Sequence, residues 1–208
     1  MSAENQTSGR DRILRRVRQA TAETSEKTSR GFRHVTPRIN GKLDKRFEER
    51  VTGSAATIER CERAEVAARV RAWCESKGAE PKAAVAPSLA GYDWQGVDCT
   101  FGSSDGSHTV AVNLAVAAIA ETGSLVLPSS PVSPANLNFL PDLEIILVDE
   151  TAIVKRMEDV WALLREAGMP RVVNIVTGPS RTADVEQTIQ LGAHGPRELH
   201  VLLLSAEP

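Results

Sequence analysis

The segment Gly178 to Glu186, GPSRTADVE, concentrates groups that can hold an anion. It follows an apolar run typical of a strand, and a glycine and a proline open it with a tight turn. An arginine guanidinium and nearby hydroxyl groups suit a carboxylate or a phosphate. Asp184, with Gln187 three residues later, has the spacing of a capping pair, so we expect a helix whose first N–H groups add to the anion site. The ligand-binding residues predicted here are Gly178, Ser180, Arg181, Thr182 and Asp184.

A plain capped turn with a surface arginine would explain the same residues equally well, and spacing alone leaves both interpretations open.

The segment Gly192 to Arg197, GAHGPR, is the second candidate. An imidazole can serve as an acid, a base or a polar clamp near neutral pH, so His194 is a predicted catalytic residue. Arg197 can hold a carboxylate or a phosphate through two parallel hydrogen bonds, and Gly195 gives the loop its turn. The alternative is a tight loop in which the histidine bonds a backbone carbonyl, which is the commoner role for a lone histidine in a turn.

The segment Glu121 to Ser124, ETGS, is the third candidate. Glu121 is a predicted catalytic acid that could pair with Arg181 or Arg197, and Thr122, Gly123 and Ser124 are predicted ligand-binding residues. A solvated acid at the end of a helix is the competing interpretation. The serines and Asp105 of the GSSDGS loop (Gly102–Ser107), with His108 directly after it, permit a nucleophilic site only weakly, because the sequence contains no G-x-S-x-G motif.

Other motifs of cofactor chemistry are absent from the sequence. Cys61, Cys74 and Cys99 form no C-x-x-C pair, and no H-x-x-x-H or H-E-x-x-H spacing occurs, so we expect no metal site. Neither a G-x-x-x-x-G-K-[ST] loop nor a G-x-G-x-x-G fingerprint is present. We therefore expect no cofactor in this chain, and the odd number of cysteines fits a reducing compartment.

The elements that position these segments follow from hydrophobic periodicity. Strands are predicted at 82–86, 97–101, 124–127, 143–148, 171–176 and 199–204. Helices are predicted at 11–20, 42–51, 54–77, 109–121, 152–167 and 183–190. Their alternation indicates an α/β fold of three layers, with a mostly parallel sheet and helices on both faces. In such sheets ligands bind beyond the carboxyl ends of the strands, where we expect the GPSRTAD loop.

Charge divides the chain unevenly. Residues 1–50 contain 13 Lys and Arg against 7 Asp and Glu, whereas the rest contains 12 against 20. We interpret residues 1–37 as a basic, partly flexible helical arm and residues 38–208 as the α/β domain. The basic residues alternate with acids and lack an aromatic ladder, which argues against nucleic-acid binding. No apolar run suits a signal peptide or a membrane span, so we expect a cytoplasmic protein.

Two longer runs resemble a known family. GPSRTADVEQTIQLGAHGPRELHVLLL (Gly178–Leu204) is similar to the C-terminal signature of LUD (lactate utilization) domains of the LutC/YkgG type. AAIAETGSLVLP (Ala117–Pro128) resembles the second motif of the same family. The two motifs occur in the family's order, and the resemblance covers about residues 40–208. It implies a fold of the NagB/RpiA/CoA-transferase-like superfamily.

Three positions depart from the family pattern. Members often have Gly-Ile-Thr where this chain has Ala111-Val112-Asn113, an acid where it has Val116, and an arginine where it has Ala135-Asn136. If those polar residues line the family's site, the departures imply an altered activity. The two C-terminal loops match the family pattern.

The resemblance implies a subunit of an L-lactate oxidation system that converts lactate to pyruvate. Iron–sulfur clusters are then expected in partner subunits and not in this chain, and the expected ligand is a small anion such as lactate or pyruvate. Two alternatives remain open: an accessory or assembly protein without chemistry of its own, and a stand-alone enzyme acting on a phosphorylated or folate-like small molecule. Whether the chain is itself an enzyme is open.

Overall fold

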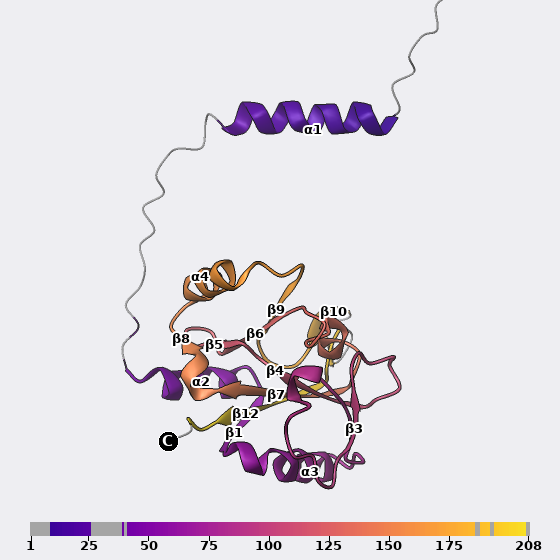
Figure 1. Cartoon of the computed structure of the whole chain (residues 1–208), viewed down its shortest axis with the longest axis vertical. Helices are drawn as coiled ribbons and strands as arrows, with labels where there is room; N and C mark the ends of the chain where they lie inside the picture. Colours follow the sequence, from indigo (N-terminus) through magenta and orange to yellow (C-terminus); the bar gives the residue numbers. More distant parts are fainter. Residues whose placement is uncertain (1–8, 26–38, 40, 186–187, 192–193, 207–208) are drawn as a thin grey trace, which may run out of the picture. The chain divides into compact units, whose positions relative to one another are not determined.

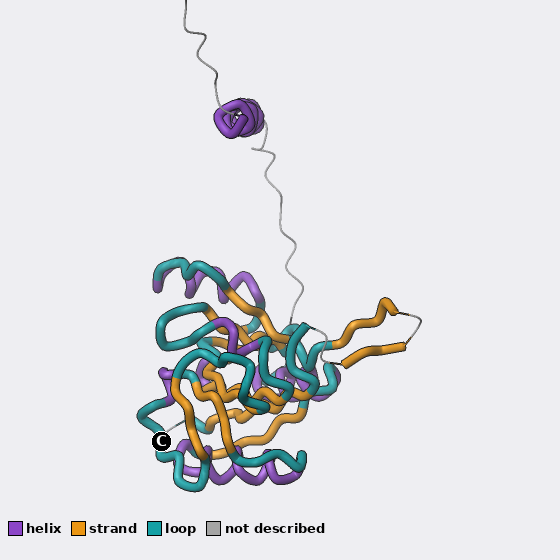
Figure 2. Tube along the Cα trace, turned by 90° about the vertical axis from the view of Figure 1, so that its right-hand side faces the viewer, coloured by secondary structure: helices purple, strands orange, loops and turns teal. Residues whose placement is uncertain are grey.

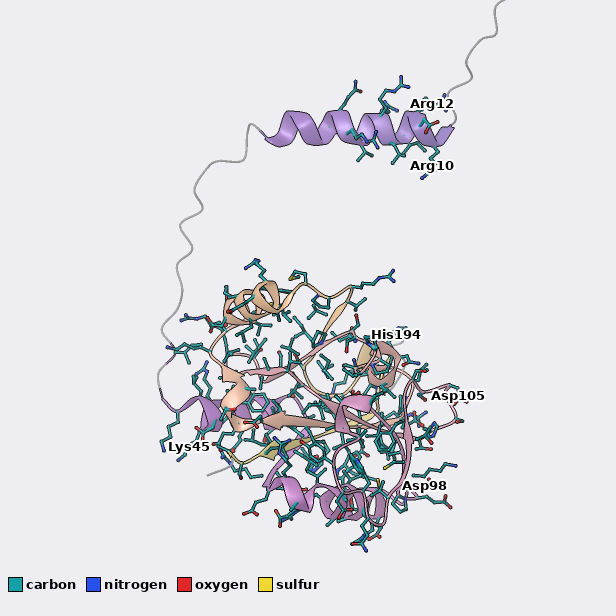
Figure 3. All side chains as sticks on the ribbon, viewed as in Figure 1. Arg10, Arg12, Lys45, Asp98, Asp105 and His194 are labelled. Carbon is teal, nitrogen blue, oxygen red and sulfur yellow. The ribbon has the colours of Figure 1, made fainter. Side chains whose placement is uncertain are left out.

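A computed structural model describes residues 9–25, 39, 41–185, 188–191 and 194–206, with the side chains of 21–25 and 182–191 left out (Figure 1). The chain divides into two units between residues 38 and 39. The first unit contains helix α1 (Gly9–Ser25), which includes the predicted helix 11–20. Its apolar residues Ile13, Leu14 and Val17 are exposed, and arginines such as Arg10 and Arg12 surround them (Figure 3).

A six-stranded sheet forms the centre of the second unit, in the order β1-β12-β7-β4-β2-β3. All of its strand pairs are parallel. The strands are β1 (Thr57–Cys61), β12 (Glu198–Leu204), β7 (Leu143–Asp149), β4 (Val110–Leu114), β2 (Lys82–Val85) and β3 (Asp98–Phe101). The inner strands are nearly continuous apolar runs because both of their faces are buried. This arrangement confirms the predicted α/β fold with a mostly parallel sheet.

Helix α3 (Val66–Ser76) covers one face of this sheet. The short 3-10 helix η1 (Arg63–Glu65) leads into it, and Glu62 and Glu65 form a capping box there. Val70, Trp73 and Cys74 pack against apolar residues of β2, β4, β7 and β12. Helix α2 (Leu43–Gly53) covers part of the opposite face with Phe47 and Val51.

A second sheet, which the sequence did not predict, lies beyond that opposite face. Its order is β8-β5-β6-β9, with antiparallel pairs β5–β6 and β6–β9 and a parallel pair β5–β8. Helix α4 packs on it through Val160 and Leu164. These elements are β5 (Ala117–Ile119), β6 (Ser124–Pro128), β8 (Ile153–Val154), α4 (Met157–Ala167) and β9 (Val173–Val176). Short 3-10 helices complete the connections: η2 (Pro87–Leu89), η3 (Ala135–Asn138) and η4 (Glu150–Ala152).

The long helix predicted at 54–77 is wrong in its first half, because Thr57–Cys61 forms strand β1. This strand is at the edge of the sheet, where one side of the backbone and most side chains stay accessible. Charged residues are tolerated there, so the segment has the composition of an exposed helix. Arg60 of this strand contacts three carboxylates, at 2.8 Å from Asp44, 2.6 Å from Glu48 and 2.7 Å from Glu150.

The buried helix predicted at 109–121 is also wrong, since the segment forms β4 and β5 in two different sheets. A continuous apolar run suits a strand buried on both faces as well as a buried helix, and its alanines favoured the wrong choice. Burial was correctly predicted for most of the run, but Val116 is 51% exposed.

The helix predicted at 183–190 is replaced by an antiparallel hairpin of β10 (Arg181–Val185) and β11 (Thr188–Leu191). Figure 2 shows the hairpin extending away from the rest of the domain. Asp184 therefore does not cap a helix, and the expected anion site at a helix N-terminus does not exist in the described residues.

Candidate functional site

Two glycines of the predicted site pack against the end of helix α2. Gly178 has a φ of +77°, and a Cβ atom there would lie 2.4 Å from the carbonyl oxygen of Ser54. Gly123 has a φ of +75°, and its Cβ would lie 2.7 Å from the carbonyl carbon of Arg50. Only glycine fits both the conformation and the space. These glycines thus have a packing role that spacing alone did not reveal.

A chain of hydroxyl groups lies beside these glycines. The Oγ of Ser124 is 2.6 Å from Oγ1 of Thr122 and 2.6 Å from Oγ1 of Thr177. It links the turn after β5 to the end of β9, so the ETGS segment and the start of the GPSRTAD segment are neighbours. Glu121 lies in the same turn, and its backbone N–H donates to the carbonyl oxygen of Lys155.

The two C-terminal loops are brought together at Ser180. Its backbone N–H donates to the carbonyl of Pro196 at 2.8 Å, and its Oγ accepts from the backbone N–H of His194 at 3.4 Å. A Cβ on Gly195 would contact Ser180 Cβ at 3.5 Å and the Asn138 carbonyl at 3.8 Å. His194 lies at the surface (Figure 3). Arg181 starts the hairpin and is exposed, whereas the side chains of Thr182 and Asp184 lie outside the described residues.

Arg197 lines a polar cleft of about 610 Å³. The cleft is at the amino ends of β2, β4, β7 and β12, because Lys82, Thr109, Leu143 and Glu198 begin or precede these strands. We expected the GPSRTAD loop at the carboxyl ends of the strands, whereas Arg197 of the second loop lines this cleft at the amino ends. The other side chains that line the cleft include Lys77, His108 and Asp142.

The charges of this cleft are partly paired. Arg197 Nε lies 3.2 Å from Asp142 Oδ1, and Lys77 forms an ion pair with Glu198. Glu121 was predicted to pair with Arg181 or Arg197, and Arg197 pairs with Asp142 instead. His108 Nδ1 is 3.9 Å from Asp105 Oδ1, and hydrogen bonds from Ser107 hold the pKa of Asp105 below its ordinary value. Both partners of the Arg197–Asp142 pair are more than half exposed, so a small anion can compete for the guanidinium at little cost.

A buried polar cluster lies beneath the C-terminal loops. The side-chain amide of Asn113 donates to Asn138 Oδ1 and to Glu144 Oε1, each at 2.9 Å. All three side chains are buried. In the sequence, Asn113 was noted only because it departs from a family pattern, and Glu144 was not predicted as a site residue. The available signal was a glutamate inside the apolar run LEIILV, since a buried acid in a central strand is costly.

Burial raises the pKa of Glu144 to about 8, although the hydrogen bond from Asn113 acts in the opposite direction. The carboxyl group is therefore mostly protonated at neutral pH. Its Oε2 atom and Asn113 Oδ1 have no hydrogen-bond partner within the described residues. Neutral carboxylic acids of this kind can donate a hydrogen bond or a proton.

The carboxyl ends of the parallel strands carry a different group. Arg63, after β1, donates to the Tyr92 hydroxyl at 2.6 Å and lies 3.5 Å from Asp149, which ends β7. The hydroxyl and backbone N–H of Thr151 lower the pKa of Asp149. This cluster ties three connections together and was not predicted.

Neither the cysteines nor the acids assemble into a metal centre in the described part of the chain, where no group of three potential ligands occurs. Burial raises the pKa of Cys61 to about 11, and also that of Cys99 to about 11. Cys74 is fully buried and its pKa is raised for the same reason. These thiols remain protonated at neutral pH. No helix within the described ranges is long and apolar enough to cross a membrane.

Residues 110–204 match the family model of the LUD domain. They include β4, the buried cluster and both C-terminal loops. The matched segment is slightly less than half of the chain, and it is similar to LUD domains. Among curated proteins, the chain is 40% identical over 88 residues to an uncharacterized protein of Neisseria meningitidis, covering 41% of the chain and 38% of that relative.

Lactate utilization protein C of two other bacteria is also similar. The chain is 36% identical over 78 residues to the protein of Anoxybacillus flavithermus, covering 38% of the chain and 36% of the relative. It is 32% identical over 101 residues to that of Bacillus subtilis, covering 46% and 42%. The chain thus matches well under half of the length of these relatives.

A crystal structure of a DUF162 family protein from Deinococcus radiodurans has the same fold. The TM-score is 0.60 at 23% sequence identity, over 81% of this chain and 99% of that one. This likeness supports the α/β architecture of the chain and concerns the fold alone.

Proposed function

We propose that this protein is a LutC-type lactate-utilization protein that binds a small carboxylate, such as lactate or pyruvate, in the cleft at Arg197. In this proposal it acts as a cytoplasmic subunit without an iron–sulfur cluster in a system that oxidises L-lactate, and partner subunits carry the clusters. The relatives named lactate utilization protein C motivate the pathway.

One observation supports the site: an arginine of the C-terminal signature lines a polar cleft together with Lys77, Lys82 and His108. Guanidinium and ammonium groups recognise carboxylates through charge-assisted hydrogen bonds. Glu80, Asp142 and Glu198 line the same cleft, and they disfavour large polyanions such as nucleotides. A ligand with a single negative charge fits this balance best.

The arrangement offers two groups for acid–base work at different depths. His194 is exposed next to Ser180, and Glu144 is buried beneath Asn138 and Asn113. An imidazole is a suitable base for the hydroxyl proton of a hydroxy acid. We therefore propose His194 as the outer proton acceptor, and Glu121 remains a secondary candidate at the neighbouring turn.

Ligand binding to the purified chain tests the proposal. L-lactate, pyruvate, propionate, phosphate and nucleotides are compared by thermal shift and by titration calorimetry. A ligand at a hundredfold excess over its Kd stabilises the native state by about 2.7 kcal/mol. We expect Arg197→Ala to weaken carboxylate binding roughly tenfold or more, because an ion-paired hydrogen bond is lost. Arg165→Ala, an exposed arginine in the last turn of α4, is the matched control.

The outcomes separate the three functions. Carboxylate binding that depends on Arg197 supports the substrate-binding subunit. Binding of a phosphorylated metabolite or a folate instead supports a stand-alone enzyme. If no small molecule binds and the chain captures iron–sulfur subunits from the same operon, the assembly role replaces our proposal.

A further inference from the structure

The polar cluster of Asn113, Asn138 and Glu144 is set into an apolar face of the central sheet. Glu144 of β7 is in register with Ala111 of β4, and Ala111 is in register with Ala84 of β2. Leu137 of η3 packs on these alanines. The face is otherwise apolar around the cluster, so a hydrogen-bonding group there has few partners to choose from.

The hydrogen bonds of this cluster leave two atoms unused. Asn113 donates both of its amide hydrogens, one to Asn138 Oδ1 and one to Glu144 Oε1. Its own Oδ1 then needs a donor. The Glu144 proton belongs on Oε2, because Oε1 already accepts from Asn113. Within the described residues, Asn113 Oδ1 has no donor and Glu144 Oε2 has no acceptor.

Unpaired polar atoms in a fully buried site are costly, at roughly 1–3 kcal/mol each. Native proteins rarely tolerate them and usually place an ordered water or a ligand there. The two unused atoms have opposite needs, one for a donor and one for an acceptor. A hydroxyl group meets both needs at once, whereas a keto oxygen only accepts and an ammonium group only donates.

We propose that Asn113 and Glu144 form a buried binding site for one hydroxyl group, which accepts from Glu144 Oε2 and donates to Asn113 Oδ1. The hydroxyl comes either from a water molecule or from a small hydroxy acid. The second source rests on the proposed function, whereas the first does not. Asn138 is a positioning residue, since it fixes the Asn113 amide and its carbonyl lies beneath Gly195.

A crystal structure that resolves ordered water, determined with and without L-lactate, tests the site directly. We expect an oxygen within about 3 Å of both Asn113 Oδ1 and Glu144 Oε2. Water in both crystals assigns the site to solvent. The hydroxyl of lactate in the second crystal assigns it to the ligand. If neither crystal has an oxygen within hydrogen-bond distance of the two atoms, the proposal is overturned.

Binding measurements distinguish this proposal from the proposed function. L-lactate, propionate and pyruvate share a carboxylate and differ at C2, so their affinities isolate the hydroxyl. With lactate as the source, the wild type prefers lactate over propionate, and Asn113→Ala reduces this preference roughly tenfold, as expected for one hydrogen bond. Asn174→Ala on β9, which also carries an unpaired amide, is the matched control.

A preference for lactate that survives Asn113→Ala excludes the ligand as the source of the hydroxyl. If none of the three carboxylates binds, the proposed function fails, and the crystal without ligand still decides the hydroxyl site. Should Asn113→Ala fail to fold, Glu144→Met serves instead. It keeps the length of the side chain and removes the donor on Oε2, so the preference for lactate should fall as in Asn113→Ala.

Discussion

His200 and Glu144 are buried on opposite faces of the central sheet, on neighbouring strands, and differ in how their polar atoms are partnered. His200 of β12 stacks on Trp73 with ring centroids 5.2 Å apart. Its ring nitrogens lie 2.7 Å from Thr57 Oγ1 and 3.2 Å from Glu59 Oε1, so both are partnered. Glu144 of β7, on the opposite face, leaves Oε2 unpaired.

This difference separates a structural residue from a candidate functional one. On the α3 face, the histidine completes the packing between sheet and helix and has no hydrogen-bonding capacity to spare. On the other face, the glutamate and its asparagine partner keep capacity for a further group. Full burial alone therefore does not indicate function, whereas burial with an unmet hydrogen-bonding need does.

The largest expected effect is on the fully partnered face. Trp73→Ala removes the ring that packs on His200 and leaves a cavity under α3, which costs about 3–5 kcal/mol of unfolding free energy. Urea unfolding monitored by far-UV circular dichroism measures this loss. Trp161→Ala on α4, where the ring is only half-buried, is the control and should cost clearly less. Equal losses of unfolding free energy would show that the stacking of Trp73 on His200 adds no stability beyond that of a half-buried ring.

The pH dependence of stability tests the opposite face. The pKa of Glu144 rises from an ordinary 4.5 to about 8 in the folded chain. Between these pH values the folded state keeps a proton that the unfolded state releases, so the free energy of unfolding falls as pH rises through this window. Glu144→Gln cannot titrate, and we expect its stability curve to lack this decline.

Urea unfolding of wild type and Glu144→Gln at intervals between pH 4.5 and 8.5 gives the comparison. Parallel curves would mean that Glu144 is ionised in the folded chain, and the donor assigned to Oε2 would then be absent. Glu198→Gln, an exposed side chain on the neighbouring strand, controls for the loss of a carboxylate.

The sequence predicts a strand or helix well when residues close together along the chain determine it, and poorly when distant residues do. The strand 143–148 was predicted from its continuous apolar run, and the helix within 152–167 from apolar residues at helical spacing. The edge strand Thr57–Cys61 was missed because its exposed charges match those of a helix. The hairpin at 181–191 was missed because its turn lies inside a segment with helix-capping spacing.

The candidate site was predicted in part for the same reason. The pairing of the two C-terminal loops spans only 14 residues, and Arg197 and His194 were identified by residue type. The contacts of Asn113 reach across 25 and 31 residues, to η3 and to β7. Only the assembled sheet brings those side chains together, so no local pattern contains them.

The smallest expected effect concerns His200. Burial lowers its pKa, and Glu59 opposes this effect only in part. The folded chain therefore keeps a neutral imidazole where the unfolded chain takes up a proton below its ordinary pKa of 6.5. The stability contributed by this group is present above pH 6.5 and is lost as pH falls below it, opposite in sign to that of Glu144.

His200→Gln should flatten the acidic side of the stability curve while leaving the decline towards pH 8 unchanged. Glu59 and Lys77 are the charged groups that face the ring, so Glu59→Gln should enlarge the acid sensitivity by removing the partner that favours protonation. Because the two buried groups act in opposite directions between pH 4.5 and 6.5, the double variant with Glu144→Gln should have the flattest curve of all. If His200→Gln also changed the decline between pH 6.5 and 8, the two faces would be coupled, and the contrast between a structural and a functional residue would no longer hold.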